Sequence, residues 1–123
     1  MEKVLTINGK QRKIKGNAMA VFLYNEQFNS DFISDTLKAL GGSEQLTALI
    51  GQEDLSTEDV LKLVDDFSAI TIYQLMWTLE KNADRDGTLP FTDWLDQVDF
   101  GVMDLIYETD FIEVLTANIS RKN

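Results

Sequence analysis

The chain has 123 residues, enough for one domain with a hydrophobic core and too few for two ordinary domains. It contains no cysteine and no histidine, which excludes disulfides, thiol nucleophiles, imidazole bases and Cys/His zinc sites. Its net charge of −10 repels phosphate backbones, so we expect no nucleic-acid partner. No apolar run approaches the roughly 20 residues of a membrane span, so we expect no membrane partner either.

The basic residues are concentrated at the N-terminus. Residues 1–15 carry five basic side chains against one acidic side chain, whereas residues 16–120 carry four against twenty. The acidic body serves solubility in the simplest interpretation, and the functional alternative is attraction to a basic partner.

Residues 4–15 predict a β-hairpin. Asn8-Gly9 is a preferred dipeptide of the type I′ turn, in which both central residues need positive φ. A two-residue turn at this place sets the pairing of the strands, which is Ile7 with Lys10, Leu5 with Arg12, and Lys3 with Ile14.

Helical periodicity follows the hairpin. A first helix of about three turns is predicted from residue 18, with an inward face of Ala18, Val21, Phe22 or Leu23, and Phe28. Ser30 is expected to cap a second helix that ends at Gly41-Gly42. Two further helices are expected to begin at the possible capping residues Ser43 and Ser56.

The segment 70–79 is apolar at seven of its ten positions. A helix that is apolar on nearly all sides is normally buried, so this segment is expected to be the central helix. A buried strand is the competing interpretation because Ile70-Thr71-Ile72-Tyr73 is β-prone, but the length of the segment favours a helix.

Two helices are predicted in the remaining sequence. Pro90 stands where a helix through Val98 begins, at a position where its missing N–H costs nothing. A last helix is predicted from Val102 to Ile119. We therefore expect a mainly α fold with an N-terminal β-hairpin (α+β by strict count), as one domain over 1–123. Its parts are the hairpin 4–15, the helical body 18–119 and the polar tail 120–123.

The stretch NADRDGTLPFTD, residues 82–93, has the spacing of an EF-hand calcium loop. Oxygen ligands fall at alternate positions, a glycine stands at the sharp turn, and an aspartate closes the twelve residues. The first ligand is Asn82 rather than aspartate, and the last is Asp93 rather than the usual glutamate. The alternative interpretation is a solvated connection between two helices.

The order of elements resembles a known family. A hairpin ending near KIKG is followed by AMAVFLYNEQFNSDF and ITIYQLMWTLEKNAD, then by PFTDWLDQ and an acidic, apolar C-terminal stretch. This resembles the tail assembly chaperones of long-tailed phages and prophages of Gram-positive bacteria. The most specific element is WTLEKNAD…LPFTDWLDQ, and the resemblance covers essentially the whole chain. In this family the segment after the Ala-Asp is a variable acidic connection, which weakens the calcium interpretation.

The resemblance implies a non-enzymatic function without a cofactor, a catalytic residue or a metal. Proteins of this family bind the tape measure protein in the host cytoplasm. They keep it soluble and extended while the tail tube assembles around it, and they are absent from the mature virion. The two alternatives are a calcium-binding module using the loop 82–93 and an acidic protein-interaction adaptor.

Two surfaces are candidates for partner binding. The apolar faces of the first and last helices are expected to receive amphipathic helices of the tape measure protein, assisted by acidic residues Asp104, Glu108 and Glu113. The alternative surface is the basic hairpin, where another copy of the chain or the tail tube protein would dock on Lys10, Arg12, Lys13 and Lys15.

Overall fold

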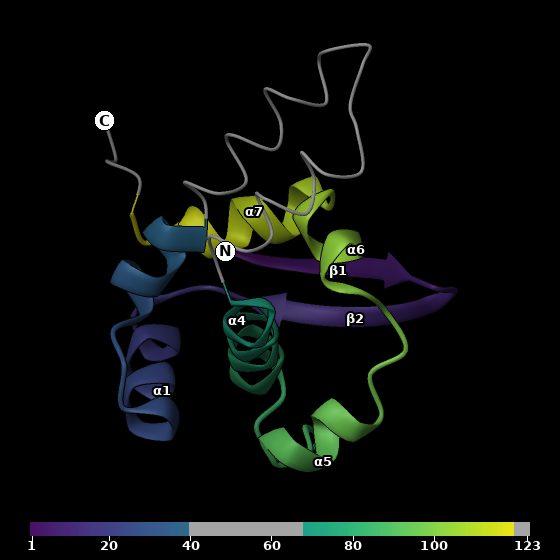
Figure 1. Ribbon diagram of the computed structural model, residues 1–123, viewed down its shortest axis with the longest axis horizontal. Helices are drawn as coiled ribbons and strands as arrows, with labels where there is room; N and C mark the ends of the chain where they lie inside the picture. The colour runs from purple at the N-terminus through teal and green to yellow at the C-terminus, as the bar shows by residue number, and fades with distance from the viewer. Residues whose placement is uncertain (40–67, 120–123) are drawn as a thin grey trace, which may run out of the picture.

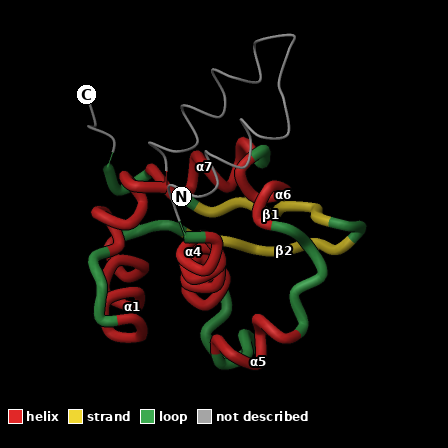
Figure 2. The backbone as a smooth tube through the Cα atoms, viewed as in Figure 1, coloured by secondary structure: helices red, strands yellow, loops and turns green. Residues whose placement is uncertain are grey.

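The computed structural model describes residues 1–39 and 68–119. Figures 1 and 2 show a two-stranded hairpin with helix α4 packed across it, and α1 and α5 beside α4. The fold is therefore mainly α with an N-terminal β-hairpin, as the sequence predicts. The helix end expected at Gly41-Gly42, the helices expected from Ser43 and Ser56, and the tail 120–123 lie outside the described residues.

The hairpin consists of β1 (Glu2–Ile7) and β2 (Lys10–Lys15). Both turn residues adopt positive φ, 52° at Asn8 and 76° at Gly9, as a type I′ turn requires. The strands pair in the predicted register, including Leu5 with Arg12. One face is inward and carries the buried side chains Leu5, Ile7 and Ile14, while the opposite face is largely exposed.

The predicted central helix is α4 (Ala69–Ala83), and the competing strand interpretation is wrong. It packs against β2, α1, α5, α6 and α7, and most of its residues from Ile72 to Leu79 are buried. This contact with five elements explains why the segment is apolar on nearly every side. None of the helices within 1–39 and 68–119 combines the length and the apolar character that a membrane crossing needs.

The first predicted helix is α1 (Ala18–Phe28), whose N-terminus is capped by the side chain of Asn17. Ala20 and Tyr24 are buried and Val21 and Phe28 pack against the core, whereas Phe22 is 57% exposed and is not an inward residue. Residues 32–39 are helical as well, but the expected cap at Ser30 is wrong. The carboxylate of Asp31 accepts from the backbone N–H of Ser34 at 2.7 Å and caps this helix instead.

The C-terminal helices are shorter than predicted. Helix α5 (Phe91–Asp96) ends before Val98, because the backbone N–H of Gln97 bonds to the third preceding carbonyl and tightens the last turn. The predicted last helix is two helices, α6 (Val102–Ile106) and α7 (Thr109–Thr116). The break occurs at Glu108, which is extended and accepts from the N–H of Asp110 at 3.4 Å as the N-cap of α7.

Aromatic side chains join the helices around α4. Trp77 and Trp94 are 4% and 6% exposed, so both pack in the core. The ring of Trp77 meets Phe28 of α1 and Phe91 of α5 with centroids 5.6 and 5.9 Å apart. Phe28 and Phe91 also contact each other with centroids 5.0 Å apart, so edge-to-face contacts join α1, α4 and α5 in one aromatic cluster and add to the burial energy.

Candidate functional site

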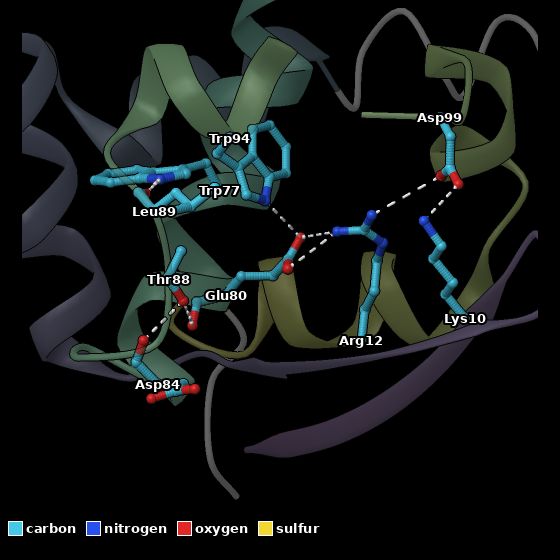
Figure 3. A network of polar contacts seen from close by, with 9 residues as sticks. All are labelled: Lys10, Arg12, Trp77, Glu80, Asp84, Thr88, Leu89, Trp94 and Asp99. Atoms are coloured by element: carbon cyan, nitrogen blue, oxygen red, sulfur yellow. Dashed lines mark hydrogen bonds and ion pairs between the residues drawn. The ribbon is translucent and has the colours of Figure 1, made fainter. Parts of the chain in front are cut away.

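A network of charged residues connects the hairpin to α4 and α5 (Figure 3). Arg12 points to the inward face of β2, where its guanidinium donates to both carboxylate oxygens of Glu80 at 3.1 and 3.2 Å. It also lies over the ring of Phe100 at 4.6 Å and 3.9 Å from Asp99. The sequence predicts Arg12 as a docking residue, but its side chain is 14% exposed and its charge is matched inside the protein.

Glu80 is the acceptor at the centre of this network. Its carboxylate receives a hydrogen bond from Nε1 of Trp94 at 3.2 Å in addition to those from Arg12. Burial raises the pKa of Glu80 above its usual value, because lost solvation outweighs the stabilisation of the carboxylate by Arg12 and Trp94.

This raised pKa gives a pH-dependent contribution to stability. Ionising Glu80 costs more free energy in the folded than in the unfolded chain. Glu80 therefore adds its full stabilisation below about pH 4.5, and this stabilisation is lost as pH rises through the pKa of the folded state. We expect the stability of the wild type relative to Glu80→Gln to fall from acid to neutral pH. Urea denaturation of both proteins across that range measures this difference, and a difference that rises with pH would contradict the assignment.

The other predicted basic residues have different environments. Lys10 forms an ion pair with Asp99 at 3.1 Å, and its hydrogen bond lowers the pKa of that exposed carboxyl. Lys13 is exposed and forms no ion pair within residues 1–39 and 68–119. Of the four hairpin residues predicted for docking, Lys13 and Lys15 therefore have no ion pair among the described residues.

The three predicted acidic residues each have a structural contact within the protein. Asp104 accepts from the backbone N–H of Gly101 at 2.8 Å at the start of α6, and Glu108 caps α7. Glu113 pairs with Lys3 of β1 at 3.5 Å. Reversing these charges would disturb two helix starts as well as any partner contact, so they are poor positions at which to test binding.

The predicted calcium loop begins inside a helix. Asn82 is the penultimate residue of α4 and is 6% exposed, and its amide donates to the carbonyl of Lys15 and to Oδ1 of Asn17, both at 2.9 Å. The carbonyl of Thr88, a ligand in the EF-hand pattern, accepts from Nζ of Lys81 at 3.2 Å. In the part of the chain that is described, no three carboxylates gather where they could hold a metal ion.

We expect millimolar calcium to leave the melting temperature unchanged, because an ammonium group already bonds the carbonyl that calcium would need. Thermal melts in chelator and in calcium, with magnesium as the control, measure this. A ligand that binds the native state at a hundredfold excess over its Kd raises stability by about 2.7 kcal/mol. A calcium-selective rise of that size would restore the EF-hand interpretation.

Helix α1 has the clearest exposed apolar face among the described helices. Ala20 and Tyr24 are fully buried on its inner side, yet Phe22 is 57% exposed and Met19 is 37% exposed. These two residues are three apart and lie on one side of the helix, and we call them the α1 face. On α7, Phe111, Val114 and Leu115 are buried and Ile112 is half-buried, so this helix exposes less apolar surface than α1.

Sequence reasoning missed the Arg12–Glu80 pair, although a signal for it was present. The predicted register places Arg12 between inward-facing positions of β2 and opposite buried Leu5. A cation at such a position needs a carboxylate partner, and Glu80 is the acidic residue within the central helix. No family model, no curated protein and no solved structure matches the chain.

Proposed function

We propose that this protein is a phage tail assembly chaperone that binds the tape measure protein and keeps it soluble and extended during tail tube assembly. The role is non-enzymatic and belongs to the host cytoplasm, and the protein leaves before the virion is complete. The proposal rests on the resemblance of WTLEKNAD…LPFTDWLDQ to that family and on the α1 face.

The residues of the resemblance have scaffold contacts in this chain. Nε1 of Trp77 donates to the carbonyl of Leu89 at 2.8 Å, and Trp94 bonds to Glu80. These bonds fix the connection between α4 and α5 rather than presenting side chains to a partner. A partner must therefore contact other surfaces of the protein.

The α1 face is the observation that carries the proposal. Its two large apolar side chains are exposed on a helix whose inner side is already packed. An amphipathic helix of the tape measure protein would cover them in the manner of helix recognition by an apolar surface. Exposed Glu26, four residues after Phe22, would meet basic residues beside the apolar stripe of that helix.

Co-expression with the tape measure protein of the same phage tests this function. The wild type is expected to keep the tape measure protein in the soluble fraction, and Phe22→Ser is expected to weaken its capture about tenfold or more. The estimate follows from about 1.5–3 kcal/mol for burying such a side chain. The soluble fraction and the Kd from co-purified complexes are the measurements.

Tyr107→Ser is the matched control, because Tyr107 is also 57% exposed but lies between α6 and α7. It should bind as the wild type does. Equal loss in both variants would remove the α1 face from the proposal. A tape measure protein that stays insoluble with the wild type would contradict the chaperone function itself.

A further inference from the structure

The outer edge of β2 has backbone groups that point away from the hairpin. Gly16 and Met1 form a doubly hydrogen-bonded pair. The backbone N–H of Gly16 donates to the carbonyl of Met1 at 2.8 Å, and the amino group of Met1 donates to the carbonyl of Gly16 at 2.9 Å. In an antiparallel ladder, hydrogen-bonded pairs alternate with pairs that form no hydrogen bonds to each other. The pairs Glu2–Lys15, Val4–Lys13 and Thr6–Gln11 are of the second kind, so their N–H and C=O groups point outward. On β2 these outward residues are Gln11, Lys13 and Lys15.

One of these outward groups already has a partner. The carbonyl of Lys15 accepts from Nδ2 of Asn82 at 2.9 Å, which places the end of α4 against this part of the edge. The outward backbone groups of Gln11 and Lys13 have no hydrogen-bond partner in residues 1–39 and 68–119. Two residues of β2 therefore present an open strand edge.

This open edge borders a pocket of about 380 Å³. Gln11, Arg12 and Lys13 form its strand side, and α4, α5 and the connection between them form the other side. Apolar surface comes from the ring of Trp94 and from Leu89, which is 40% exposed. The pocket thus offers apolar contact directly beside unpaired backbone groups.

The charges at the pocket favour one kind of occupant. Arg12 and Glu80 neutralise each other, and Asp84 on the far side of the pocket accepts from the backbone N–H of Gly87 at 3.0 Å. On the strand side, the Lys13 ammonium is unmatched among the described residues. In a strand added to β2, the residue opposite Lys13 would lie on the outer face beside that ammonium, and a carboxylate there forms a favourable cross-strand pair. Its neighbours in sequence would point to the inward face, toward Trp94 and Leu89.

We propose that this edge of β2 binds an extended segment of a partner protein as an added strand, with an apolar side chain in the pocket and an adjacent acidic residue opposite Lys13. Backbone hydrogen bonds to Gln11 and Lys13 would supply affinity, and the pocket would supply side-chain specificity. Neither Met19 nor Phe22 of the α1 face lines the pocket, so this second site does not depend on the proposed binding of the tape measure protein.

A labelled synthetic peptide tests the site by fluorescence anisotropy. The probe is Thr-Val-Thr-Leu-Asp-Val-Thr, and the comparison peptide has Lys in place of its Asp. We expect the Asp peptide to bind about two- to fivefold more tightly to the wild type. Lys13→Glu should reverse this preference. An absence of saturable binding by the Asp peptide, or a preference that Lys13→Glu leaves unchanged, would overturn the proposal.

Two proline variants test the strand edge. Gln11→Pro removes an outward N–H that the hairpin does not use, and it should weaken the Asp peptide about tenfold. Thr6→Pro is the matched control, because Thr6 faces Gln11 across the hairpin and its own N–H points to the opposite edge. Binding that survives Gln11→Pro, or that is lost equally in Thr6→Pro while both variants melt as the wild type does, would overturn strand addition.

Discussion

Replacing Glu80 by alanine is expected to lower the free energy of unfolding by about 3 kcal/mol. The side chains of Arg12 and Glu80 are each 14% exposed, so the substitution leaves a largely buried guanidinium with only the more distant Asp99 as a counter-ion. It also removes the acceptor for Nε1 of Trp94. Urea denaturation followed by far-UV circular dichroism measures this loss without relying on the fluorescence of Trp94.

Glu113→Ala provides the control for an exposed ion pair. Glu113 pairs with Lys3 at 3.5 Å, but both side chains are more than a third exposed, so the loss should stay below about 1 kcal/mol. The double replacement of Arg12 and Glu80 by leucine should recover most of the loss, because it leaves no unpaired charge. Equal losses in Glu80→Ala and Glu113→Ala would mean that the Arg12–Glu80 pair is as solvated as a surface pair.

Local signals were sufficient to predict the hairpin and the central helix. The Asn8-Gly9 turn determines the register because a two-residue loop allows one pairing of its flanking residues. The apolar segment 70–79 predicts a buried helix because no solvated face interrupts it. In both cases the deciding interactions lie close together in sequence.

Boundaries that depend on distant residues could not be predicted in the same way. Helix α4 continues through Asn82 because the amide of that residue bonds to Lys15 and Asn17, more than sixty positions earlier. The division between α6 and α7 is also hidden, because apolar residues recur at helical spacing on both sides of Glu108. When two successive helices continue the same apolar periodicity, the pattern alone does not show where the first ends and the second begins.

The candidate sites show the same limit. A count of charges indicates a basic hairpin, but it does not separate Arg12, which points inward to Glu80, from Lys13, which is exposed. Likewise the finding that Phe22 faces away from the core needed the position of α4 against α1. Surface assignments therefore required the packing of the elements as well as their identity.

Gly16→Ala is expected to lower the free energy of unfolding by about 3 kcal/mol as well. A Cβ atom at Gly16 would overlap the backbone carbonyl oxygen of Val114 and lie 3.0 Å from its Cγ1. Val114 belongs to α7 and is fully buried, so neither atom can move aside without displacing that helix. The hydrogen bonds between Gly16 and Met1 would be strained by any compensating shift of the strand. Thermal and urea denaturation measure the effect.

Two other glycines separate this steric effect from the backbone preferences of glycine. At Gly101 a Cβ atom meets nothing closer than an oxygen of Asp104 at 3.8 Å, so Gly101→Ala should stay within about 0.5 kcal/mol of the wild type. At Gly9 there is open space but φ is 76°, so Gly9→Ala should cost about 1–2 kcal/mol through the backbone alone. Alanine also lowers the entropy of the unfolded chain, which favours folding in all three variants. A large loss confined to Gly16 would therefore measure how closely α7 packs on the end of β2, and a loss no larger than at Gly101 would require α7 to lie farther from the hairpin.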